Sequence, residues 1–96
     1  MAVVGGQRYL VSMLGGDAAW VRNVRAAHGQ AVLRHGRTER VHLEEVAVPE
    51  RGPVLKAYLG LAPGARAHLG LGPDATLAQC HAIAPRVPVF RVRPAP

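Results

Sequence analysis

The segment 8–24, RYLVSMLGGDAAWVRNV, constrains the fold more than any other part of this chain. An apolar run over 9–14 predicts a strand that stops at Gly15 and Gly16. Asp17 is expected to cap an amphipathic helix, because its side chain can accept hydrogen bonds from the first free amides. A helix N-terminus that follows a glycine turn can receive an anion, since backbone N–H groups and the helix dipole point outward there. The same turn also serves many α/β proteins simply as a connection.

Length and composition predict one small folded domain over 1–96. Hydrophobic residues make up 49% of the chain and aromatic residues 4%, so the core must consist mainly of Val, Leu and Ala. No apolar run approaches the roughly 18 residues that span a bilayer, and the N-terminus lacks the pattern of a signal peptide. A single cysteine, Cys80, excludes an internal disulfide framework. We therefore expect a cytoplasmic domain with no membrane span.

The charge is strongly positive, with 12 basic and 6 acidic residues and a formal net charge of +6. Such a surface attracts nucleic acid or a phosphorylated cofactor, whereas an arginine-rich composition with solvated side chains explains the same excess. Nucleic-acid modules usually add stacking aromatic residues or a known motif, and this sequence has neither. A nucleic-acid partner is therefore not expected.

Periodicity and turn residues predict an alternation of strands and helices. The expected elements are a short strand at 2–4, a strand at 8–14, a helix at 17–28, strands at 30–35 and 40–49, a helix that starts near 53, a short helix at 75–84 and a strand at 88–93. Gly29 should end the first helix and Asp74 should cap the last one. Glu44 and Glu45 break the strand alternation and suggest a bulge. The segment 60–72 is expected to be a loop with at most one helical turn.

This order favours an α+β fold with a mainly antiparallel split β-barrel and two or three packed helices. Four or five strands are too few to close a barrel comfortably, so exposed sheet edges need covering. Dimerisation is one solution, and we expect a homodimer.

The sequence contains no self-contained catalytic machinery. Its five histidines show no zinc-like spacing with Cys, Asp or Glu, so no metal site is expected. Ser12 lacks the context of a nucleophile elbow, and Glu44 and Glu45 on one strand face opposite ways. The catalytic residues stay unknown, and a cofactor would have to carry any difficult step.

The sequence resembles the deazaflavin-dependent nitroreductase family along nearly its whole length. The matching segments are 8–15 (RYLVSMLG), 20–27 (WVRNVRAA), 29–33 (GQAVL), 41–46 (VHLEEV), 50–59 (ERGPVLKAYL) and 84–92 (APRVPVFRV). Members of this family are split-barrel proteins that use coenzyme F-420, an 8-hydroxy-5-deazaflavin. The resemblance therefore implies an oxidoreductase that transfers hydride from reduced F-420 to an electron-poor small molecule, with flavin mononucleotide as the less favoured cofactor.

The resemblance also implies which residues hold the cofactor. Its phosphate and acidic tail would lie against the turn and the helix start, and the family pattern W-x-x-N falls beside that site. The residues assigned to cofactor binding are Ser12, Met13, Gly15, Gly16, Trp20, Asn23 and Arg25. Arginine pairs well with phosphate and carboxylate groups, and Arg8 and Arg22 are further candidates. Trp20 fits equally well as an anchor of the core.

Two departures from the family pattern keep a second hypothesis open. The sequence begins almost at strand 8–14, where family members have a preceding helix and strands, and Leu14 stands where some relatives have a basic residue. Either a partner chain completes the fold, the sequence is shortened, or cofactor binding has been lost. The alternative is a non-catalytic binding or interaction protein on the same scaffold, which no longer binds the cofactor or only sequesters it.

Overall fold

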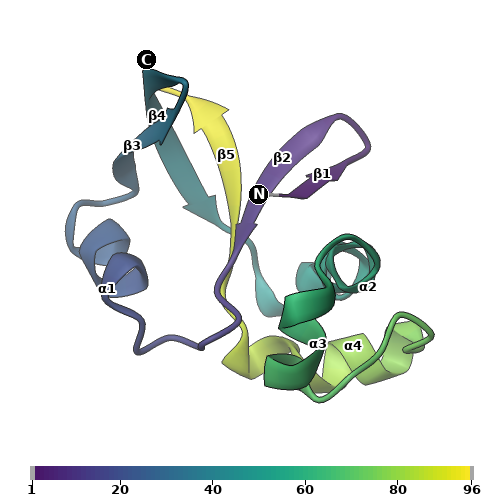
Figure 1. The fold of residues 1–96 in the computed structure, drawn as a ribbon. Coiled ribbons are helices and arrows are strands. Elements are labelled where there is room, and N and C mark those ends of the chain that lie inside the picture. The colour runs from purple at the N-terminus through teal and green to yellow at the C-terminus, as the bar shows by residue number, and fades with distance from the viewer. Residues whose placement is uncertain (1, 96) are drawn as a thin grey trace.

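Two hairpins joined by one central strand form the sheet of this protein. The computed structural model describes residues 2–95 (Figure 1). Its elements are β1 (Ala2–Val4), β2 (Gln7–Val11), α1 (Ala19–Ala26), β3 (Gln30–His35), β4 (Arg37–Glu45), the 3-10 turn η1 (Val48–Glu50), α2 (Arg51–Leu61), α3 (Pro63–Leu69), α4 (Leu77–Ile83), the 3-10 turn η2 (Ala84–Arg86) and β5 (Val89–Pro94). Within residues 2–95, no helix combines the length and the apolar character needed to cross a bilayer.

The strand order is β1-β2-β5-β4-β3, and all neighbouring strands are antiparallel. β5 therefore pairs with both hairpins, and its register sets Phe90 opposite Leu10 and Val92 opposite Leu43. The sheet is open, with β1 and β3 at its edges. The predicted α+β class and the antiparallel sheet are confirmed, but the described residues contain four α-helices rather than the predicted two or three.

Each face of the sheet has its own apolar core. On one face Phe90, Val92 and Leu43 pack with Val21 and Val24 of α1. On the other face Tyr9 and Val89 pack with α2, α3 and α4, and that larger cluster is completed by Val46, Val54, Leu55, Leu59, Ala65, Leu69, Ala75, Cys80, Ala84 and Val87. In Figure 1 α1 lies beneath β3 and β4, and the other helices lie beneath β1 and β2. Successive residues of β5 point to opposite faces, so this one strand contributes to both cores.

Local conformations explain why the first hairpin was predictable and why the first helix differs in its ends. Gly5 and Gly6 both have positive φ, at 58° and 79°, as a tight two-residue hairpin requires.

The prediction that Asp17 caps α1 is wrong, because Ala18 occupies that position without a side-chain hydrogen bond. At the other end His28, with a φ of 55°, takes the left-handed position expected for Gly29. The Gly29 amide then donates to Val24 O at 2.8 Å, which closes the helix.

The bulge predicted at Glu44 and Glu45 is also wrong. β4 pairs with β5 without interruption through Glu44↔Arg91 and Glu45↔Phe90. Regular alternation sends the two carboxylates to opposite faces of the sheet, where each finds arginines. Ion pairing with arginines therefore explains why two consecutive acidic residues stand in a regular strand.

Pro53 lies in the first turn of α2, as predicted, because the helix begins at Arg51. Two other predictions for the helical region are wrong, and the first is the loop 60–72, much of which is helix α3. Pro63 occupies the first turn of α3, and the helix ends at Gly70 with a φ of 72°. Asp74 does not cap α4, because Thr76 accepts from the Gln79 amide while Gln79 accepts from the Thr76 amide.

Candidate functional site

The chain folds back on itself directly after β2. The Gly15 amide donates to Ser12 O at 3.1 Å, and the Ser12 hydroxyl donates to Gly15 O at 2.6 Å. Ser12 is buried, and its own amide donates to Pro88 O at 2.9 Å. Gly15 has a φ of 87°, which a residue with a Cβ rarely adopts. The turn is therefore held by its own hydrogen bonds, and both polar groups of Ser12 are engaged within the protein.

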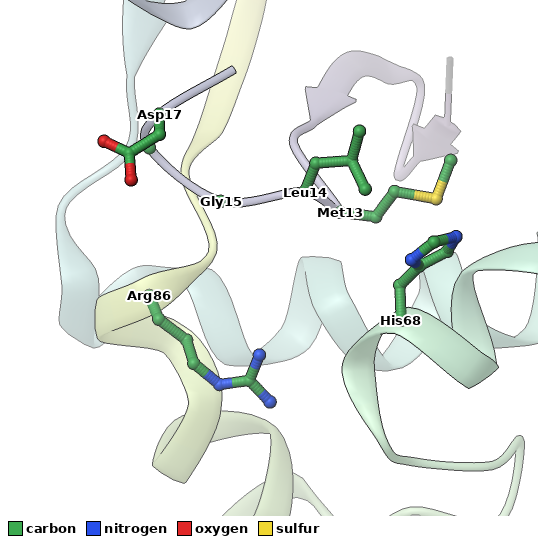
Figure 2. A pocket seen from close by; sticks show the side chains of 7 residues that line it. Met13, Leu14, Gly15, Asp17, His68 and Arg86 are labelled. Carbon is green, nitrogen blue, oxygen red and sulfur yellow. The ribbon is translucent and has the colours of Figure 1, made fainter.

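A recess of about 500 Å³ lies against this turn. It is lined by Met13, Leu14, Gly15, Gly16, Asp17, His68 and Arg86. In Figure 2 the Arg86 guanidinium lies below the turn, the His68 ring lies to the right, and Asp17 lies at the upper left, above the turn. One guanidinium nitrogen of Arg86 donates to Leu69 O at 3.0 Å, which fixes the side chain beside the recess. The recess thus combines a guanidinium, an imidazole and one carboxylate.

Arg25 lies near Gly16 but is bound to a carboxylate. A Cβ placed on Gly16 would lie 3.5 Å from Arg25 Nη1. Arg25 donates to both carboxylate oxygens of Glu45, at 3.0 and 2.7 Å, and Arg51 donates to Glu45 Oε2 at 3.1 Å. These two guanidinium groups, Arg25 first, lower the pKa of the Glu45 carboxyl. Arg25 is therefore engaged by Glu45, but this carboxylate is shared with Arg51, so the three side chains keep a net positive charge.

Trp20 lines a second, apolar cleft of about 400 Å³. The cleft is lined by Leu10, Val11, Trp20, Val24, Ala31, Val32, Leu33, Leu43 and Tyr58. The Trp20 ring makes an edge contact with Phe90 at a centroid distance of 5.5 Å, and 37% of the residue stays exposed. Trp20 therefore packs against the core through Phe90 and also forms one wall of the cleft.

The predicted cofactor-binding residues fall into three groups. Ser12, Met13, Gly15 and Gly16 lie together in the turn, with Arg25 alongside. Trp20 belongs to the apolar cleft instead, although Leu10 and Val11 of that cleft lead directly into the turn. Asn23 is exposed on α1, and its side chain has no partner within residues 2–95.

Two residues of the recess were not predicted from the sequence. Arg86 precedes β5, and His68 lies in the segment that was expected to be a loop. The antiparallel pairing of β2 with β5 was the available signal for Arg86, because it brings the start of β5 to the end of β2. Nothing comparable in the sequence places α3 beside the turn.

Comparison of the chain with protein-family models, curated proteins and solved structures found no match. Within residues 2–95, no three His, Cys, Asp or Glu side chains lie close enough to hold a metal ion. Function must therefore be argued from the two cavities and the turn between them.

Proposed function

We propose that the protein binds a deazaflavin, coenzyme F-420, and acts as an oxidoreductase on a small electron-poor substrate. The fold would then be an open form of the split barrel, with its five-stranded sheet curved around the cofactor. The single observation that carries this proposal is the apolar cleft walled by Trp20, which leads along one stretch of chain to a glycine turn beside Arg86.

The apolar cleft suits the planar ring of such a cofactor. Its volume falls in the range of small-molecule sites, and its lining is almost entirely aliphatic and aromatic. The Trp20 indole N–H and the Tyr58 hydroxyl are the hydrogen-bonding side-chain groups among its lining residues. An aromatic face can stack on the ring, while a hydroxyl at the wall can orient it or exchange a proton with a bound substrate.

The recess beside the turn suits the acidic tail in part. Arg86 can pair with a phosphate or a carboxylate, and His68 adds a donor on the same side. Asp17 disfavours an anion on its own side of the turn, so the tail should lie on the side where Arg86 and His68 are. Ser12 and Arg25 contribute less than their positions in the sequence implied, because their polar groups are engaged by Gly15 and Glu45.

In the proposed reaction the protein would position the bound ring against the substrate and limit the access of water. A reduced deazaflavin supplies hydride, and the protein holds the ring and the substrate in contact. The aliphatic walls formed by β2 and β3 would exclude water from one side of the ring. Exposure of Trp20 leaves the other side open to a substrate.

A fluorescence titration with F-420, beside flavin mononucleotide, tests the proposal. We expect saturable binding of F-420 that is weakened roughly 5- to 150-fold by Trp20→Leu, since stacking of a base-like ring on an aromatic side chain contributes about 1–3 kcal/mol. Leu61→Ala is the matched control, because Leu61 is exposed and lies outside both cavities. Circular dichroism must show that each variant is folded. Absence of F-420 binding by the folded wild type contradicts the proposal.

A cofactor-sequestering protein without catalytic activity is the second candidate. The internal engagement of Ser12 and Arg25 favours it, because fewer polar groups remain to orient a reactive complex. The two candidates differ in turnover. An oxidoreductase oxidises reduced F-420 when a nitroaromatic substrate is added, so the absorbance of the reduced cofactor falls. A sequestering protein binds the cofactor and leaves that absorbance unchanged.

A further inference from the structure

The outer side of β3 presents unpaired backbone groups in a defined pattern. Leu43 N donates to Gly29 O at 2.7 Å, and Ala95 N donates to Arg40 O at 3.4 Å. Antiparallel pairs alternate between hydrogen-bonded and non-hydrogen-bonded, so these two bonds fix the pattern of the whole β3–β4 ladder. Residues 31 and 33 and the Gly29 carbonyl direct their backbone groups to β4, whereas residues 32 and 34 and the Gln30 carbonyl direct theirs away from the sheet. The Gln30 amide is engaged within the chain, because it donates to Ala27 O at 3.2 Å.

Apart from the exposed, charged Arg34, this edge lacks the usual features that prevent pairing. β3 is six residues long, contains no proline and pairs with β4 without a bulge. The opposite edge strand, β1, has only three residues. Val32 stands at the middle of the outward-facing set, and 49% of it is exposed. A partner strand could therefore add to β3 far more readily than to β1.

The sequence of β3 is complementary to itself in one antiparallel register. When Val32 lies opposite Val32 of a second copy, Gln30 lies opposite Arg34 and Ala31 lies opposite Leu33. Residues whose backbone groups point outward then lie opposite one another. The Val32 groups of the two copies pair with each other, and each Arg34 amide meets the Gln30 carbonyl of the other copy. The apolar side chains meet each other, and neither arginine faces a like charge directly.

We propose that the protein forms a symmetric dimer in which β3 pairs with β3 of a second copy, with the two-fold axis at Val32. The pairing joins two five-stranded sheets into one continuous sheet. Isologous contacts of this kind close on themselves, so the association stops at two copies. This inference does not depend on cofactor binding.

The same pairing would complete the apolar cleft. Ala31, Val32 and Leu33 line that cleft and also form the middle of the paired strand. The second copy's strand would therefore lie beside the cleft wall and shield its β3 side from water.

Cysteine cross-linking tests the register directly. Opposed residues of a hydrogen-bonded antiparallel pair have Cα atoms about 5.5 Å apart, which is within the range of a disulfide. Val32→Cys should therefore give a disulfide-linked dimer under mild oxidation. Val3→Cys on β1 is the matched control, because Val3 is an edge valine of similar exposure, 58% against 49% for Val32. Cys80 is buried and should not react in the folded protein. Equal cross-linking of the two variants overturns the proposal.

Sedimentation velocity on the chain without added cysteine tests the dimer itself. We expect wild type to dimerise, Val32→Lys to weaken the dimer at least about tenfold by opposing two charges at the axis, and Val3→Lys to leave it unchanged. Val32→Pro should also weaken it while the hairpin stays folded, because the Val32 amide points away from β4. A monomeric wild type, or a dimer that survives both Val32 variants, overturns the proposal.

Discussion

Arg51 should contribute far more to stability than Arg25, although both bind the same carboxylate. The Arg51 side chain is buried, with a relative exposure of 7%, and the Arg25 side chain is 46% exposed. Arg51 donates to Val46 O at 2.8 Å, to Ala84 O at 2.9 Å and to Glu45 Oε2 at 3.1 Å. It therefore joins the end of β4 to the turn between α4 and β5. Arg25 contacts only Glu45 among these groups.

The expected loss follows from those bonds. Arg51→Met removes two short hydrogen bonds from a charged donor to buried carbonyls while it keeps most of the side-chain volume. Hydrogen bonds to charged groups contribute about 1.5–3 kcal/mol each, so we expect the free energy of unfolding to fall by about 3 kcal/mol. Arg25→Gln removes an exposed ion pair, for which a loss of about 0.5 kcal/mol is typical.

Urea denaturation followed by circular dichroism measures both losses. For a domain of this size, a loss of about 3 kcal/mol lowers Tm by roughly 12–24 °C. The Arg25→Gln variant should unfold within a few degrees of wild type. Equal losses in the two variants would refute the reasoning, because the two arginines make bonds of similar length to Glu45 and differ mainly in burial and in the carbonyl bonds.

Three other predictions concern packing, acid and thiol chemistry. Gly52→Ala should lower the free energy of unfolding by about 1 kcal/mol, because its Cβ would lie 2.6 Å from His81 Cε1. Gly60→Ala in the same helix meets nothing within 4 Å and should raise the free energy of unfolding. Urea denaturation measures both changes. The Arg25 guanidinium lowers the pKa of Glu45 in the folded state, so the ionised carboxyl stabilises the fold above its unfolded pKa, and this contribution is lost as pH falls. Between about pH 5 and pH 3, Tm of wild type should therefore drop more than Tm of Glu45→Gln. Equal drops would contradict this prediction. Burial raises the pKa of the Cys80 thiol, so a disulfide reagent at pH 8 should label it only after urea unfolds the chain, and rapid labelling of the native protein would contradict that.

Much of the sheet could be predicted because local chemistry determines it. Gly5 and Gly6 allow only a tight turn, and the strand at 30–35 was predicted with the bounds that the structure shows. Boundaries were missed where the stabilising partner is distant in the sequence. Glu44 and Glu45 looked irregular because the arginines that pair with them lie on other elements.

The candidate site likewise combines residues that local sequence predicts with residues that only tertiary packing brings there. The turn at 12–16 was recognisable from its glycines, and Trp20 from its place on the helix. Arg86 and His68 reach the recess only through tertiary packing, so no local pattern could mark them. Sequence also gave no sign that Ser12 and Arg25 are engaged by neighbours, since a hydroxyl and a guanidinium look equally available in a list of residues.

The position of β5 has a consequence for how the chain acquires its structure during synthesis. The hairpins β1–β2 and β3–β4 leave the ribosome early, yet neither pairs with the other. Their facing edges, on β2 and β4, wait for residues 89–94, which are translated last of all the strands. Until then a nascent chain holds two half-sheets with open backbone groups and no common core. Folding of the sheet is thus delayed until residues 89–94 have been translated, and the edges of β2 and β4 are the surfaces that a chaperone would need to protect until then.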